Sequence, residues 1–211
     1  MRTIWIVRHG NRYDFVHPEW FNHAPRKYDP PLSDDGTIQA QTLAERLKLE
    51  PVNYIFSSPF LRAIQTAYFI AKQLNLAIKI EAGLGEWHNP HWMHQKPLTA
   101  PLQQLIKQYP LIEQNYQSQI IPQYPETLEE VEKRITKTAQ ILITKYTDNI
   151  LFVGHSISVQ GMVKHLFPNC ETINTPLCGM TKLNQLSSGW ELELNGDTSH
   201  LNHLPPPIIA E

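Results

Sequence analysis

Short apolar runs alternate along the chain with longer segments in which apolar residues recur every three or four positions. The runs at 3–7, 52–56, 77–80 and 149–153 are rich in β-branched residues and are typical of buried strands. The segments at about 33–50, 58–74, 127–146 and 156–167 have the spacing of amphipathic helices. Two later runs, at 180–186 and 190–194, predict a final pair of strands around a Ser-Ser-Gly turn. This alternation predicts an α/β fold, a three-layer α/β/α sandwich with a mostly parallel central sheet.

Polar residues mark three predicted helix starts. Ser33 precedes the first helix as an N-cap, and Pro51 is expected to end it. Ser58 reads as a cap before Pro59 at the first helical position of the next helix. Thr127 has a glutamate three residues later, which is the pattern of a capping box.

Two segments, 13–31 and 87–101, have no clear period and are rich in proline, histidine and aromatic residues. Long irregular loops inside a compact domain are usually functional or mobile, so we expect these two to be walls or lids over a site. The alternative is a pair of packed surface loops without ligand contact. With no repeat and no linker, residues 1–211 are predicted to form a single domain, in which 198–211 is a loose tail.

Composition narrows the function classes. A net charge of −2 and a pI near 6.5 argue against a general nucleic-acid binder, which would carry a basic face. No run approaches the roughly 20 apolar residues of a membrane span, and we find no secretory signal. Cys170 and Cys178 do not make a disulfide framework, so packing is their expected role. A reducing cytoplasm is therefore the expected location.

Two histidines each follow a predicted strand directly. His9 lies in Arg8-His9-Gly10 after the run at 3–7, and His155 lies in Gly-His-Ser after the run at 149–153. In open α/β sheets, ligands bind beyond the carboxyl ends of the strands. We therefore expect both imidazoles at one edge of the sheet, with the Arg8 guanidinium available for a phosphate-type ligand.

Together with the blocks at 57–67 and 83–87, these motifs resemble the histidine phosphatase (phosphoglycerate mutase-like) superfamily. The resemblance runs from about residue 3 to about residue 166 and keeps the family order of all four blocks. Within the superfamily, the first motif and Gly-Leu-Gly-Glu-Trp look most like the Sts and ecdysteroid-phosphate phosphatases. Asn11 departs from that branch, which has glutamate there, and Gly-His-Ser replaces its usual Ala-His-Ala.

The resemblance implies a role for each motif residue. His9 is expected to be the nucleophile that forms a phosphohistidine, and His155 to be the second catalytic histidine, which donates to the phosphoryl oxygens. Arg8 and Arg62 match the two phosphate-clamping arginines, and Arg12 matches an extra phosphate-binding arginine of the Sts-like branch. Glu86 is the expected general acid, because a carboxyl beside a tryptophan could be desolvated and stay protonated near neutral pH.

Three further histidines close to Glu86 raise the question of a metal. His88, His91 and His94 have a suggestive spacing, but proline at 90 breaks the helix that such a spacing needs. The implied chemistry requires neither metal nor cofactor, so none is expected. Asp14 and Asp29 could orient arginines and are given no catalytic role.

These residues predict a phosphomonoester hydrolase whose partner is a small-molecule or phosphopeptide phosphomonoester, and not a nucleic acid or a membrane. A homodimer is left open. The first alternative is a phosphoglycerate mutase or bisphosphatase, which Asn11-Arg12 disfavours because that branch continues with Glu or Gln and then Ser. The second is a non-catalytic phospholigand-binding module, which should have lost His9, Glu86 or an arginine.

Overall fold

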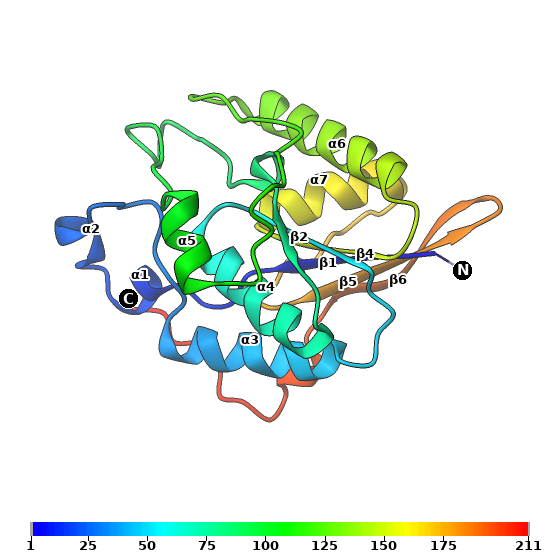
Figure 1. Cartoon of the computed structure of the whole chain (residues 1–211), viewed down its shortest axis with the longest axis horizontal. Coiled ribbons are helices and arrows are strands. Elements are labelled where there is room, and N and C mark those ends of the chain that lie inside the picture. Colours follow the sequence, from blue (N-terminus) through cyan, green and yellow to red (C-terminus); the bar gives the residue numbers. More distant parts are fainter. Residues whose placement is uncertain (1, 211) are drawn as a thin grey trace.

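The computed structural model describes residues 2–210, which form a six-stranded sheet between two layers of helices (Figure 1). The strands are β1 (Thr3–Arg8), β2 (Tyr54–Ser57), β3 (Ile78–Ile80), β4 (Ile150–Gly154), β5 (Met180–Leu186) and β6 (Gly189–Asp197). Their order across the sheet is β3-β2-β4-β1-β5-β6. The first four strands in this order are parallel to one another. β5 runs antiparallel to β1, and β6 runs antiparallel to β5. The predicted three-layer α/β/α architecture is confirmed, with a mixed sheet.

Alternate side chains of the central strands enter two separate cores. Trp5 and Val7 of β1 belong to the core under α3 (Asp34–Leu47), α4 (Leu61–Leu74) and α5 (Leu102–Gln108). Ile4 and Ile6 point into the core under α6 (Leu128–Lys145) and α7 (Ser156–Leu166). A strand that is buried on both faces must be apolar throughout, which explains the continuous hydrophobic runs in the sequence. Figure 1 shows α6 and α7 above the sheet and α3 below it.

Two of the three predicted helix starts are confirmed. The Ser33 side chain accepts a hydrogen bond from Gly36, and Thr127 forms the capping box with Glu130. The third is wrong, because α4 begins at Leu61 with Phe60 as its N-cap. The first long helix also ends at Leu47, before Pro51.

The first aperiodic segment contains short helices that the pattern does not predict. Within 13–31 lie two single turns, α1 (Tyr13–Val16) and α2 (Trp20–His23), and α5 follows directly after the second segment. Two 3-10 turns, η1 (Ala82–Leu84) and η2 (Ser199–Leu201), were also missed. These elements span one or two turns, which is too short for an amphipathic period to be recognised.

The chain from 202 to 210 has no helix or strand, yet hydrogen bonds hold it against the first loop. The Asn11 side-chain amide donates to the Ile208 carbonyl at 2.7 Å, and the Ile208 N–H donates to Asp35. Asn11 also donates to Asp35, at 2.8 Å. Its side chain therefore braces the loop after β1 against α3 and the tail. Among residues 2–210, none of the helices is long and apolar enough to cross a bilayer.

Candidate active site

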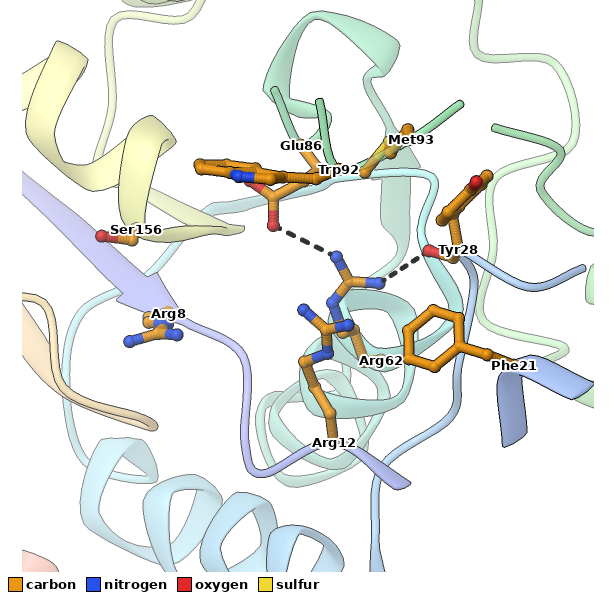
Figure 2. A pocket seen from close by; sticks show the side chains of 9 residues that line it. All are labelled: Arg8, Arg12, Phe21, Tyr28, Arg62, Glu86, Trp92, Met93 and Ser156. Carbon is orange, nitrogen blue, oxygen red and sulfur yellow. Dashed lines mark hydrogen bonds and ion pairs between the residues drawn. The ribbon is translucent and has the colours of Figure 1, made fainter. Parts of the chain in front are cut away.

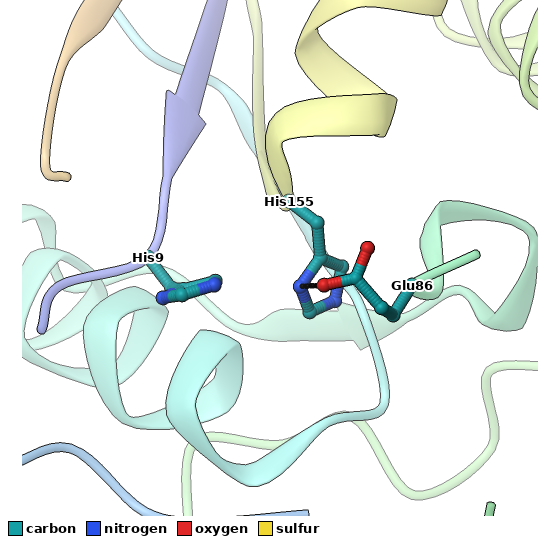
Figure 3. Close-up of side chains that lie close together, drawn as sticks. All are labelled: His9, Glu86 and His155. Atoms are coloured by element: carbon teal, nitrogen blue, oxygen red, sulfur yellow. Dashed lines mark ion pairs between the residues drawn. The ribbon is translucent and has the colours of Figure 1, made fainter. Parts of the chain in front are cut away.

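The two strand-end histidines lie side by side because β1 and β4 are parallel neighbours. Arg8 pairs in register with Gly154, and the His9 N–H donates to the Gly154 carbonyl at 3.0 Å. The imidazole rings of His9 and His155 have centroids 5.2 Å apart and meet edge to face (Figure 3). The prediction that the two rings share one edge of the sheet is confirmed.

A backbone carbonyl sets the tautomer of His9. Its Nδ1 lies 2.7 Å from the Gly10 carbonyl oxygen, which can only accept, so Nδ1 carries the proton. Nε2 is then the free lone pair, and the Nε–H of Arg62 points at it from 3.2 Å. Burial, together with the nearby charge of Arg62, lowers the pKa of His9 well below 6.5. His9 thus presents an unprotonated nitrogen into the site.

Arg62 is buried in the first turn of α4, and its guanidinium contacts all three other groups at the centre of the site. Besides His9, its Nη2 lies 3.2 Å from Nδ1 of His155 and 3.3 Å from Oε2 of Glu86. Burial lowers the pKa of Arg62 to about 10, so it stays positively charged at neutral pH. Asp29 fixes the start of the helix by accepting from the Leu61 N–H at 2.6 Å. Asp29 therefore orients α4 rather than a phosphate-binding guanidinium, and its ion-pair partner is Arg26.

His155 is the N-cap residue of α7 and is fully buried. Its Nε2 lies 2.8 Å from Oγ of Ser58, and burial lowers its pKa to about 4, so the ring is neutral at pH 7. Ser58 is thus a partner of the second histidine, whereas the sequence suggested a helix cap. The available signal was its place in the 57–67 block, four residues before Arg62.

Glu86 projects towards the two histidines from the segment after η1, with 18% of its side chain exposed. One carboxylate oxygen lies 3.3 Å from His155 Nδ1 (Figure 3). Burial alone raises the pKa of Glu86, but the neighbouring His155 and Arg62 outweigh it, so the pKa falls well below its usual range. Because His155 is neutral at pH 7, Arg62 is the charge that keeps Glu86 ionised there. The lowered pKa contradicts the expectation that desolvation keeps Glu86 protonated near neutral pH.

A pocket of about 320 Å³ opens above these groups and is lined by three arginines (Figure 2). Arg8 is held by a 2.7 Å hydrogen bond to the Thr175 carbonyl, and Arg12 makes a two-pronged ion pair with Asp14. The role expected for Asp14, orienting an arginine, therefore fits the geometry. Three guanidiniums in one small pocket, two of them paired with Asp14 and Glu86, offer forked donors that suit an oxyanion such as a phosphoryl group.

Four further pocket residues are largely apolar and come from the two aperiodic segments. They are Phe21, Tyr28, Trp92 and Met93. The Tyr28 hydroxyl accepts from the His94 N–H at 3.0 Å, which joins the two segments, and its carbonyl accepts from Arg62 at 3.4 Å. Both segments thus line the pocket as walls. The sequence did not single out these four side chains, and only their place in aromatic loops pointed to them.

The described residues bring together one group with metal-ligand geometry, and it is His9, Glu86 and His155, with donor atoms within 4.8 Å of one another. Arg62 contacts all three, so a permanent cation already occupies the position between them. The suggestive set in the second loop does not converge in this way. His88 instead bonds the Gln123 carbonyl through Nδ1.

Comparison with known proteins agrees with this geometry. The family model "Histidine phosphatase superfamily (branch 1)" matches residues 4–198. The crystal structure of the Bombyx mori ecdysone phosphate phosphatase with tungstate superposes with a TM-score of 0.79 at 22% identity, covering 100% of this chain and 96% of that one. At this identity the likeness shows the fold.

Curated relatives are more diverse in name. The transcription factor tau 55 kDa subunit of Saccharomyces cerevisiae is 27% identical over 97% of this chain and 52% of its own length. The Bombyx mori ecdysteroid-phosphate phosphatase is 26% identical over 77% of this chain and 30% of its own length. The chain thus spans about half or less of these two relatives. Phosphoglycerate mutase-like protein 4 of Arabidopsis thaliana is 27% identical over 94% of this chain and 86% of its own length.

Proposed function

Since the chain belongs to branch 1 of the histidine phosphatase superfamily, we propose that it hydrolyses phosphomonoesters through a phosphohistidine formed on His9. One observation carries the proposal. The Nδ1 proton of His9 is bound to the Gly10 carbonyl, so Nε2 is unprotonated, and it accepts from Arg62, one of three arginines that line the adjoining pocket. That is the arrangement that nucleophilic attack on a phosphoryl group needs.

In the first step, Nε2 of His9 attacks phosphorus while the bond to the leaving oxygen breaks. Arg8, Arg62 and His155 surround the position of the phosphoryl oxygens, where negative charge is concentrated in the transition state. Glu86 passes to the leaving oxygen a proton that the phosphomonoester monoanion brings into the site, so an alcohol departs and Glu86 is again a carboxylate.

In the second step, the Glu86 carboxylate takes a proton from water, and the hydroxide attacks the phosphohistidine. The nitrogen–phosphorus bond breaks, inorganic phosphate forms, and His9 regains its neutral lone pair. The proton on Glu86 leaves with the phosphate product or passes to solvent, which restores the carboxylate, and the cycle closes without a metal or cofactor.

The pocket walls favour a phosphomonoester with a bulky apolar leaving group. Phe21 and Trp92 line the pocket and are exposed to solvent, whereas Met93 and Arg62 are buried and Arg8 and Arg12 are half-buried. An aromatic or polycyclic group on the ester oxygen would contact these side chains as the phosphate reaches the cations. A triose phosphate would leave these apolar side chains without a contact to the substrate.

Replacement of the nucleophile tests the proposal. We expect His9→Ala to lower the rate of p-nitrophenyl phosphate hydrolysis by about 10³ or more. Wild type quenched during turnover should contain a phosphoenzyme that is stable to alkali and labile to acid. His165→Ala, at the far end of α7, is the matched control and should keep full activity. Hydrolysis that survives His9→Ala would overturn the mechanism.

Two other functions make different predictions. A mutase on phosphoglycerate-like substrates is favoured by one relative's name, and it would interconvert 2- and 3-phosphoglycerate when primed with the bisphosphate. A non-catalytic binding module is suggested by the relative that is named as a transcription-factor subunit. Such a module would bind vanadate without turning over p-nitrophenyl phosphate, and would contradict the proposed hydrolysis.

A further inference from the structure

A buried ion pair between Arg134 of α6 and Glu126, which lies just before that helix, contacts the peptide segment that carries Glu86. Arg134 and Glu126 are 7% and 3% exposed, and they join by two hydrogen bonds of 2.6 and 2.8 Å. The pair lines none of the active-site pocket. Burying two charges is costly, and their mutual attraction alone often fails to compensate, so such a pair calls for a second role.

The remaining donors of Arg134 all go to the backbone around Glu86. Nη1 donates to the carbonyls of Gly83 and Gly85 at 2.9 and 3.1 Å, and Nη2 donates to the Glu86 carbonyl at 3.1 Å. With the two bonds to Glu126, these contacts use the five N–H groups of a guanidinium. A lysine ammonium has three donors and cannot reproduce the pattern.

Glu126 binds the other side of the same segment. Its carboxylate accepts from the His88 N–H at 3.2 Å, and its backbone carbonyl accepts from Nε1 of Trp87 at 2.9 Å. The peptide is thus fixed immediately before and immediately after Glu86.

The carbonyl of Leu84 completes the set, since it accepts from Ser158 of α7 at 2.9 Å. Four consecutive carbonyls, from residue 83 to residue 86, therefore have side-chain donors. A side chain at Gly83 would strike Thr138 of α6, so α6 and the segment approach as closely as backbone permits. The backbone of this segment is therefore fixed on several sides, and the Glu86 side chain extends from it into the pocket.

We propose that Arg134 and Glu126 are positioning residues for acid–base catalysis, which set the Glu86 carboxyl at the leaving oxygen. This inference rests on the proposed function. Proton transfer needs heavy atoms within about 2.6–3.2 Å, and a displacement of about 1 Å can cost about 10²-fold in rate. The phosphate clamp is built on other elements, so loosening the pair should disturb the acid and spare the clamp.

The test compares two leaving groups, because p-nitrophenolate departs without a proton and an alkoxide does not. We expect Arg134→Lys to slow single-turnover phosphorylation of His9 by an alkyl phosphate by about 10–100-fold, and by p-nitrophenyl phosphate only a few-fold. Vanadate affinity should be unchanged. Glu126→Gln, which keeps the shape, is the milder variant and should show the same contrast if Arg134→Lys folds poorly.

A double-mutant cycle makes the test specific. In the Glu86→Gln background, Arg134→Lys should cause no further loss on the alkyl phosphate, because the proton that it positions is already gone. Glu132→Gln, two residues away on the exposed face of α6, is the matched control and should behave as wild type. Equal losses on both esters, or weakened vanadate binding, would overturn the positioning role while hydrolysis itself stands. Loss of the His9 dependence would instead remove the proposed function.

Discussion

Protonation states at the centre of the site determine how the first step can begin. His9 is neutral because burial and Arg62 lower its pKa, and Glu86 is ionised because His155 and Arg62 outweigh the effect of its burial. The nucleophile is therefore ready at neutral pH, and the acid lacks its proton. A phosphate monoester has a second pKa of about 6, so its monoanion can bring the proton that Glu86 passes to the leaving oxygen. The dianion then faces the cations.

This arrangement predicts an acidic pH optimum for kcat/KM. On the alkaline side the rate should fall above about pH 6, as the substrate monoanion disappears. On the acid side it should fall only well below pH 6.5, where His9 becomes protonated, because its folded-state pKa is lowered. The measurement is a pH profile for several esters whose second pKa values differ. The alkaline limb should move with the substrate's pKa, and a limb fixed above pH 7 for every ester would show that Glu86 keeps its own proton.

A metal should be dispensable, because the Arg62 guanidinium already contacts each of the three groups that would bind one. We expect no change in the rate of p-nitrophenyl phosphate hydrolysis after dialysis against EDTA. The check is activity before and after dialysis, with zinc or magnesium added back. Inactivation that a divalent ion reverses would contradict the expectation and would point to His9, Glu86 and His155 as ligands.

At the level of elements, the sequence predicted what depends on a repeated pattern. Strands and long helices were predictable, because one buried face repeats along several turns or residues. Ser58 was misassigned because a serine before a proline is the same local signal for a helix cap and for a tight turn. The two structures are distinguished only by the contact between Ser58 and His155, which are 97 residues apart in the sequence. The roles of Arg134 and Glu126 depend on contacts between α6 and a distant turn, and local sequence carries no trace of these.

The two pocket-lining loops should decide substrate preference, and Trp92 is the side chain that tests this. It lines the pocket and remains 63% exposed, so Trp92→Ala should leave folding intact. Aromatic contacts of this kind contribute about 0.5–1.5 kcal/mol, so KM for naphthyl phosphate should rise roughly three- to tenfold. KM for ethyl phosphate should not change.

Leu98→Ala is the control for that variant, because Leu98 lies in the same loop, is 60% exposed and is not among the pocket residues. It should leave both KM values as in wild type. If Trp92→Ala raised KM for both esters equally, the aromatic wall would have no part in selecting the leaving group.

At the scale of the whole molecule, folding brings three positively charged arginine side chains together. Arg8, Arg12 and Arg62 come from the end of β1, the following loop and the start of α4, and all three line one pocket. The sequence, through its resemblance to a family, predicted which arginines would meet there. It also offered Asp14 as a group that orients an arginine, but not the pairing of Arg62 with Glu86, because these two residues meet across 24 positions.

An oxyanion that binds these guanidiniums should stabilise the folded protein. A ligand that binds only the folded state at 100 times its Kd adds about 2.7 kcal/mol to the free energy of unfolding. For a chain of this size, each kcal/mol raises Tm by about 2–4 °C, so saturating vanadate should raise Tm by roughly 5–10 °C. Sodium chloride at equal ionic strength should not. Arg12→Ala should reduce the vanadate shift, whereas Arg46→Ala, whose side chain pairs with Glu50 on the surface, should retain it. A shift that is the same in both variants would mean that Arg12 does not contact the bound anion, and that its pairing with Asp14 serves the loop alone.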